Sequence, residues 1–93
     1  MATALTAEER SELATSRPDW SVDEKSMTRT FTFVDFGEAI AFVARTALAA
    51  EVLDHHPDID IRWNRVTLVL STHSAGGLTE LDQDLASTVD GFV

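Results

Sequence analysis

Apolar residues recur along the chain with two spacings, one typical of helices and one typical of strands. In the segment 36–54 they return every three or four positions, which predicts an amphipathic helix. In the segments 27–34 ("MTRTFTFV") and 58–63 ("DIDIRW") they alternate with polar residues, which predicts half-buried strands. The run "VTLVLST" follows after only Asn64 and Arg65, and two residues between alternating runs indicate a β-hairpin.

Three short motifs predict where helices begin, because each has a capping residue three positions before an acid. They are "TAEE" (6–9), "DFGE" (35–38) and "TELD" (79–82). The first helix is expected over about residues 7–15 and the third after Thr79. The second should end near Asp54, because Pro57 disfavours helix at the residue before it. The expected apolar face of this second helix consists of Phe36, Ile40, Val43, Ala47 and Ala50.

The order of these elements indicates the fold class. A short strand near residues 20–23 is expected before the strand 27–34, so the order is helix, two strands, helix, two strands, helix. This order predicts an α+β fold in which three helices pack on one face of a four-stranded antiparallel sheet. The sequence contains no repeat, linker or low-complexity segment, so a single domain is expected over residues 1–93.

The composition is typical of a soluble globular protein, with 44% hydrophobic and 25% charged residues. The net charge of −9 disfavours direct binding to nucleic acid or to an anionic membrane. The chain contains no cysteine, which excludes disulfides and thiolate metal sites. The first ten residues lack the basic and apolar regions of a signal peptide, and no apolar run is long enough to span a membrane. We therefore expect a cytoplasmic protein.

The register of the hairpin determines which residues lie opposite the histidines. If residues 64–65 form the turn, each apolar residue of one strand opposes an apolar residue of the other. The predicted pairs are Trp63 with Val66, Ile61 with Leu68, and Ile59 with Leu70. The same ladder, when extended, places His56 opposite His73, and directly opposed residues have Cβ atoms about 4.5–5.5 Å apart. His55 adjoins them at the helix exit, so all three histidines of the chain are expected to form one patch.

A patch of three histidines has three interpretations. Imidazoles exchange protons near neutral pH, so several around one pocket suit general acid–base catalysis, and Glu51 and Asp54 are near enough to orient a ring. Imidazole is also a common zinc ligand, which leaves a metal site open. Histidines at the end of a helix can also simply stabilise its dipole. The residue pattern leaves all three interpretations open.

The segment 51–82 resembles the signature of the pterin-4a-carbinolamine dehydratase family. That signature is an acid, three residues, His-His-Pro, an aromatic residue, Thr-His and an aspartate. At the family's spacing these positions are Glu51, His55, His56, Pro57, Trp63, His73 and Asp82. Trp20 and the runs "LTAEER", "RTFTFVDFGEAIAFV" and "AGGLTELDQDLA" also resemble family blocks, so the likeness covers nearly the whole chain. The chief departure is Trp63, where many members have tyrosine.

The resemblance implies an enzyme that dehydrates a 4a-hydroxytetrahydropterin to the quinonoid dihydropterin, without a metal or an organic cofactor. The substrate arises when aromatic amino acid hydroxylases use a tetrahydropterin, and a reductase recycles the product. By resemblance, His55 and His73 are the acid–base candidates around C4a, and His56 binds and orients the pterin. Trp63 could help to shape the site. The acidic positions that match those near the family's site are Glu51, Asp54 and Asp82.

Some of these residues also have a structural interpretation. Asp82 completes the capping box after Thr79, Glu51 could be a solvated helix residue, and Trp63 could pack in the core or in an interface. The resemblance also implies a second class of function, because animal members serve as dimerisation cofactors of a homeodomain transcription factor. A non-catalytic interaction module is therefore the alternative. Family members commonly form oligomers and open sheet edges invite pairing, so a homodimer or homotetramer is expected.

Overall fold

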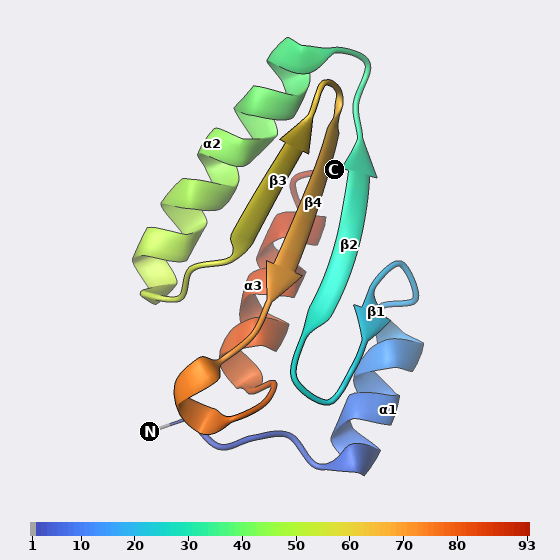
Figure 1. Cartoon of the computed structure of the whole chain (residues 1–93), viewed down its shortest axis with the longest axis vertical. Coiled ribbons are helices and arrows are strands. Elements are labelled where there is room, and N and C mark those ends of the chain that lie inside the picture. The colour runs from blue at the N-terminus through green and yellow to red at the C-terminus, as the bar shows by residue number, and fades with distance from the viewer. Residues whose placement is uncertain (1) are drawn as a thin grey trace.

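The computed structural model describes residues 2–93 and has the element order that the sequence predicts (Figure 1). The α-helices are α1 (Ala7–Ser16), α2 (Phe36–Leu53) and α3 (Glu80–Asp90). The strands are β1 (Ser21–Val22), β2 (Met27–Thr32), β3 (Asp58–Arg62) and β4 (Arg65–Leu70). The predicted α+β class is confirmed. One element was not predicted, a short 3-10 helix between β4 and α3, η1 (His73–Ala75).

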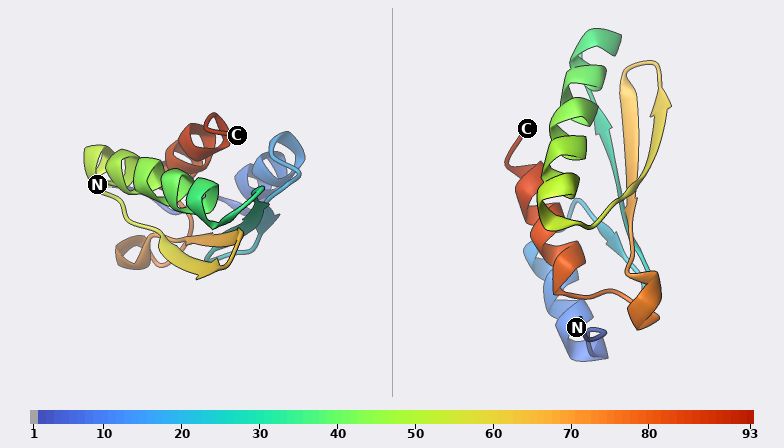
Figure 2. Two further views of the ribbon diagram at one scale, coloured as in Figure 1. Left: turned by 90° about the horizontal axis from the view of Figure 1, so that it is seen from above. Right: turned by 90° about the vertical axis from the view of Figure 1, so that its left-hand side faces the viewer.

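The four strands form one antiparallel sheet in the order β1-β2-β4-β3. All three α-helices cover the same face of this sheet, and the opposite face is open (Figure 2). On the open face the hydroxyls of Thr30 and Thr67 form a hydrogen bond of 2.8 Å between β2 and β4. The strands β1 and β3 are the edges, and every residue of β3 is exposed.

Each α-helix begins at the capping residue that the sequence predicts. The hydroxyl of Thr6 accepts the amide of Glu9, whose carboxylate in turn accepts the amide of Thr6. A second capping box starts α3 at Thr79, and the carboxylate of Asp35 caps α2. These caps satisfy amide groups that have no partner within the helix, and they explain why the helix starts are readable from the sequence.

The buried face of α2 is rotated from the face that the sequence predicts. Its buried residues are Ala39, Phe42, Thr46 and Ala50. In the predicted stripe Phe36, Ile40 and Ala47 are exposed, Val43 is partly buried and only Ala50 is buried. Because α2 has apolar residues on more than one side, the helical period alone does not determine which side packs on the sheet.

No helix within residues 2–93 combines the length and apolarity needed to cross a membrane.

The β3–β4 hairpin turns one residue earlier than predicted, at residues 63–64, and its register differs by two residues. Ile61 opposes Val66, and Ile59 opposes Leu68. A shift of two residues keeps every side chain on its own face, so the apolar pattern fits both registers and cannot distinguish them. The prediction of the register is therefore wrong. The core face of β4 is as predicted, whereas Ile59 and Ile61 of β3 are exposed and Trp63 lies in the loop.

Two local features hold the hairpin loop. Trp63 takes the first loop position with a φ of 50°, and the side-chain amide of Asn64 donates a hydrogen bond of 2.8 Å to the carbonyl of Phe33. The ladder ends at the pair of Asp58 with Val69, and its register, extended by two residues, would place His56 level with Ser71. The predicted pairing of His56 with His73 is therefore wrong, because His73 lies beyond the end of β4, in η1.

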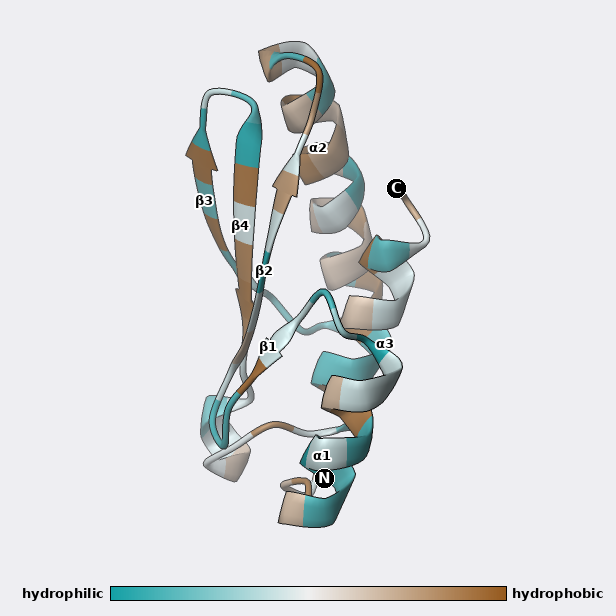
Figure 3. Cartoon of the chain, turned by 90° about the vertical axis from the view of Figure 1, so that its right-hand side faces the viewer, coloured by the Kyte–Doolittle hydropathy of each residue, from teal (hydrophilic) through white to brown (hydrophobic). Residues whose placement is uncertain are grey.

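The hydrophobic core lies between the helices and the covered face of the sheet. Apolar and polar bands alternate along β3 and β4 in Figure 3, as expected for strands with one face turned to a core. The largest fully buried apolar side chains come from β2, β4, α3 and the segment before α3. They are Met27, Val66, Leu68, Leu70, Leu78, Leu85 and Val89.

One carboxylate ties the N-terminal third of the chain to the end of α3. Asp90 accepts hydrogen bonds from Nη1 of Arg17 at 2.9 Å, from Nη1 of Arg29 at 2.7 Å and from Nε1 of Trp20 at 3.0 Å. Arg29 also lies 4.2 Å from the centroid of the Phe31 ring, within the range of a cation–π contact. Three donors from the N-terminal third thus converge on Asp90, which is 61 to 73 residues away from them in sequence.

Thr46, on the buried face of α2, is expected to reduce stability. Its hydroxyl is fully buried and has no hydrogen-bond partner among the described residues. An unpaired buried polar group costs about 1–3 kcal/mol. Because valine has nearly the same shape without the hydroxyl, Thr46→Val should raise the free energy of unfolding, measured in urea, by about 1 kcal/mol. Thr46→Ser keeps the hydroxyl and loses a methyl group, so it should be less stable than the wild type. A Thr46→Val variant less stable than the wild type would contradict this account.

Candidate active site

The connection from α2 to β3 sends two adjacent histidines in different directions. After α2 ends at Leu53, Asp54 adopts a left-handed conformation with a φ of 49°. Aspartate tolerates this conformation better than most residues other than glycine. His55 is then buried, whereas His56 is exposed, and Pro57 leads the chain into β3.

His55 is hydrogen-bonded to a buried carboxylate. Its Nε2 lies 2.6 Å from Oδ1 of Asp82, whose side chain is completely buried. The other oxygen, Oδ2, accepts the hydroxyl of Thr72 at 2.7 Å and the backbone amide of Thr79 at 2.9 Å. Asp82 therefore both completes the capping box of α3 and holds His55.

His56 is paired with Glu51 at the surface. The distance from Nε2 to Oε2 is 2.9 Å, and the two side chains are 57% and 73% exposed. An ion pair this exposed adds little to stability. The contact places the ring of His56 beside Glu51 at the surface.

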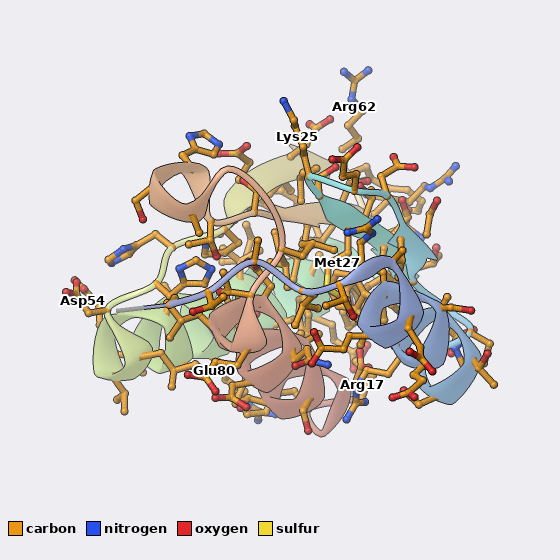
Figure 4. The ribbon with its side chains drawn as sticks, turned by 90° about the horizontal axis from the view of Figure 1, so that it is seen from below. Arg17, Lys25, Met27, Asp54, Arg62 and Glu80 are labelled. Atoms are coloured by element: carbon orange, nitrogen blue, oxygen red, sulfur yellow. The ribbon has the colours of Figure 1, made fainter. Side chains whose placement is uncertain are left out.

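A cleft of about 270 Å³ brings the three histidines together. It lies where the end of α2, the start of β3, the end of β4 and η1 meet. Figure 4 looks onto this end of the molecule and labels Asp54 at the end of α2. The lining residues other than histidine are Asp54, Asp58, Val69, Ser71, Thr72 and Ser74. The volume is near the lower end for small-molecule sites, and most of the lining groups are polar.

The structure gathers six of the seven predicted site residues at this cleft. Four of them line it: Asp54, His55, His56 and His73. Glu51 contacts His56, and Asp82, which does not line the cleft, contacts Nε2 of His55. Trp63 is not brought to the cleft within this chain. It is 68% exposed at the tip of the β3–β4 hairpin, at the opposite end of β3 (Figure 1).

Sequence reasoning missed three polar residues of this region. Thr72 binds the carboxylate of Asp82, Thr79 was identified only as a helix cap, and Asp58 lines the cleft. The contact between Thr72 and Asp82 depends on how the end of β4 packs against the start of α3, which no local pattern reveals. The available signal was the Thr-His pair at residues 72–73, where only the histidine was singled out.

The metal interpretation gains no support from the geometry. Across residues 2–93 no group of three or more histidine, cysteine, aspartate or glutamate side chains is arranged to hold a metal ion. The carboxylates nearest the histidines are engaged instead as hydrogen-bond acceptors, Asp82 with His55 and Glu51 with His56.

Comparison with known sequences gives one consistent family. The family model described as pterin 4 alpha carbinolamine dehydratase matches residues 3–92. A protein of Chloroflexus aurantiacus with the provisional name pterin-4-alpha-carbinolamine dehydratase is 52% identical over 86 residues, which cover 92% of each chain. A Picosynechococcus protein with the same provisional name is 49% identical over 90 residues, 97% of this chain and 98% of its own.

Two solved structures have a similar fold. A crystal structure described as a transcriptional coactivator/pterin dehydratase from Brucella melitensis has a TM-score of 0.90 at 42% identity, covering 96% of this chain and 97% of its own. A pterin dehydratase-like protein, identified as a RuBisCO assembly factor in the alpha-carboxysome, has a TM-score of 0.64 at 22% identity. It covers 77% of this chain and 83% of its own, and at this identity the likeness concerns the fold alone.

Proposed function

Because the chain belongs to the pterin 4 alpha carbinolamine dehydratase family, we propose that it dehydrates a 4a-hydroxytetrahydropterin to the quinonoid dihydropterin. The observation that carries this proposal is the convergence of three histidines on one cleft, with one of them held by a buried carboxylate. A protein that only binds a partner has no need of this arrangement.

The reaction needs one group that gives a proton and one that takes a proton. The N5–H bond breaks and its electron pair forms the C4a=N5 double bond. The C4a–O bond breaks as the 4a-hydroxyl accepts a proton and leaves as water. Imidazoles suit both steps near neutral pH. We assign the acid–base pair to His55 and His73, and the binding and orientation of the pterin to His56 with Glu51.

The proposal includes no metal and no organic cofactor, because the elimination moves only protons and a hydroxyl group. It places the reaction in the recycling of tetrahydropterin, where a reductase consumes the quinonoid product. The cytoplasmic location expected from the sequence stays a prediction.

The test is the rate at which a 4a-hydroxytetrahydropterin, generated in situ by phenylalanine hydroxylase, loses its absorbance. General acid–base groups contribute about 100- to 10,000-fold each, so the protein should accelerate the decay clearly over the spontaneous rate. The acceleration should persist in the presence of a chelator. A folded protein that gives no acceleration would overturn the proposal and favour the alternative, a non-catalytic interaction module.

We also propose that the chain forms a homodimer or a homotetramer through the outer side of α2 and the edge strand β3. Large apolar side chains are exposed there. On these two elements and their flanks they are Val34, Phe36, Ile40, Leu48, Val52, Ile59, Ile61 and Trp63. An apolar surface beside an open strand edge is typical of an interaction site, and a second copy would cover both features at once.

Leu48, which is 69% exposed on α2, provides the test of this surface. Wild-type protein should sediment as a dimer or tetramer at micromolar concentration. Leu48→Glu places a charge in the proposed interface, so it should weaken association by about tenfold or more. Ser87→Glu, on the exposed side of α3, adds the same charge elsewhere and should leave association unchanged. A wild-type protein that is monomeric at every concentration would contradict this proposal.

A further inference from the structure

The hydrogen bonds behind His55 have only one consistent set of donors. The carboxylate of Asp82 can only accept, so at Oδ2 the hydroxyl of Thr72 and the amide of Thr79 both donate. The hydroxyl of Thr72 has one proton, which is thereby used. In its contact of 2.9 Å with the hydroxyl of Thr79, Thr72 must therefore accept. Thr79 in turn accepts the amide of Leu81 at 3.2 Å.

The same argument fixes the tautomer of His55. At Oδ1 the carboxylate of Asp82 again accepts, so Nε2 of His55 carries a proton. When one ring nitrogen is bound in this way, the neutral imidazole has its lone pair on the other nitrogen, here Nδ1. Among the described residues Nδ1 has no hydrogen-bond partner. It is also not one of the buried polar atoms that lack a partner, so it is not fully buried. His55 lines the cleft and its side chain is 10% exposed, so we infer that this lone pair is available to a ligand there.

We propose that Thr72 and Thr79 are positioning residues, which hold Asp82 and thereby fix His55 as the proton acceptor in the cleft. This inference rests on the proposed function and deepens it. The N5–H bond of the substrate breaks as the bond from Nδ1 of His55 to that proton forms. The electron pair becomes the C4a=N5 double bond, and the 4a-oxygen takes a proton from His73 and leaves as water. The acceptor later returns its proton to solvent.

His55 is buried, whereas His56 and His73 are exposed. Asp82 and Thr79 are fully buried and Thr72 is 6% exposed, so the network excludes water, and satisfied buried networks are rigid. The negative charge of Asp82 also stabilises the imidazolium that forms when Nδ1 of His55 takes a proton. Within residues 2–93 the partner of His56 is the exposed Glu51, so its ring is not held in one tautomer by burial.

Nitrogen NMR of the full chain tests the tautomer without reference to activity. The resonances of His55 are assigned by their loss in His55→Gln. Above neutral pH the wild type should show a protonated Nε2 and an unprotonated Nδ1. Thr72→Val should shift His55 toward a mixture of tautomers. A wild-type His55 with its proton on Nδ1 would overturn the inference, whether or not the protein is a dehydratase.

Kinetics of the dehydration test the positioning role. Thr72→Val removes the hydroxyl at nearly constant volume, and Thr72→Ser restores it. In metal sites the loss of a hydrogen-bond partner of a ligand typically costs about 10- to 100-fold, and we expect Thr72→Val to lower kcat by a similar factor. KM should stay within about twofold, and Thr72→Ser should recover most of the rate. Equal loss in both variants, or an unchanged kcat in Thr72→Val, would overturn the positioning role.

A matched control separates this effect from the general loss of a threonine hydroxyl. Thr30 forms a similar threonine pair with Thr67, at 2.8 Å on the open face of the sheet. Thr30→Val should leave both kcat and the tautomer of His55 unchanged. If Thr72→Val fails to fold, the wild-type tautomer and the rate of Thr72→Ser still decide the inference. If the wild type gives no dehydration, the proposed function fails and the NMR result still decides the hydrogen-bond assignment.

Discussion

Replacement of His73 by alanine is expected to remove most of the dehydration activity and to leave the fold intact. His73 lines the cleft at the start of η1 and is exposed, so its ring contributes little to packing. As the proposed proton donor to the leaving hydroxyl, it should contribute about 100- to 10,000-fold. We therefore expect kcat/KM to fall at least about 100-fold, measured by the decay of the 4a-hydroxytetrahydropterin at equal protein concentration.

The neighbouring residue provides the control for His73. Ser74 lines the same cleft but is no proton donor at neutral pH, so Ser74→Ala should retain nearly the wild-type rate. Both variants should unfold in urea within about 0.5 kcal/mol of the wild type, because surface substitutions usually have effects of this size. Acceleration that is unchanged by His73→Ala would keep the activity and reject this role of His73.

The largest expected effect on stability comes from Asp90→Ala, at about 2–4 kcal/mol of unfolding free energy. The substitution leaves the guanidinium groups of Arg17 and Arg29 and the indole N–H of Trp20 without their shared acceptor. Arg17 is 30% exposed and Arg29 19%, so water compensates part of the loss and the effect stays below that of a fully buried pair. In a domain of this length the melting temperature should fall by about 10–25 °C.

Asp19 is the matched control for Asp90. Its carboxylate lies 3.8 Å from Nη2 of Arg29 and is 74% exposed. An exposed pair of this kind contributes at most about 1 kcal/mol, so Asp19→Ala should change the unfolding free energy very little. A loss for Asp90→Ala no larger than that for Asp19→Ala would reject the account of Asp90 as the tie between α3 and the N-terminal third. Far-ultraviolet circular dichroism in urea measures both variants.

The order of the elements and the helix starts could be predicted because their signals are local. A cap such as Thr6 or Thr79 acts on amides two or three residues away, and strand alternation is set by the backbone itself. The buried side of α2 and the register of the hairpin could not be predicted. The apolar pattern fits more than one side of α2 and more than one hairpin register. Packing against the rest of the molecule selects one of them, and the local pattern does not show which.

The gathering of the histidines illustrates the same limit. All three line one cleft, as the sequence predicts, but not through a pairing of His56 with His73. They meet because the left-handed turn at Asp54 buries His55 and exposes His56, while η1 brings in His73. The Thr-His pair drew attention to residues 72–73, but the contact of Thr72 with Asp82 joins the segment after β4 to the first turn of α3, which no local pattern reveals.

The double role of Asp82 couples the chemistry of the cleft to the first turn of α3. The same carboxylate that caps the helix holds His55, so fraying of this turn releases the histidine as well. Local openings of a helix end require less free energy than global unfolding. On warming, the protein should therefore lose the proposed activity at a temperature below its melting point, and it should recover this activity fully on cooling. Slow amide hydrogen exchange at the start of α3 would indicate that the first turn is intact and that Asp82 still binds His55.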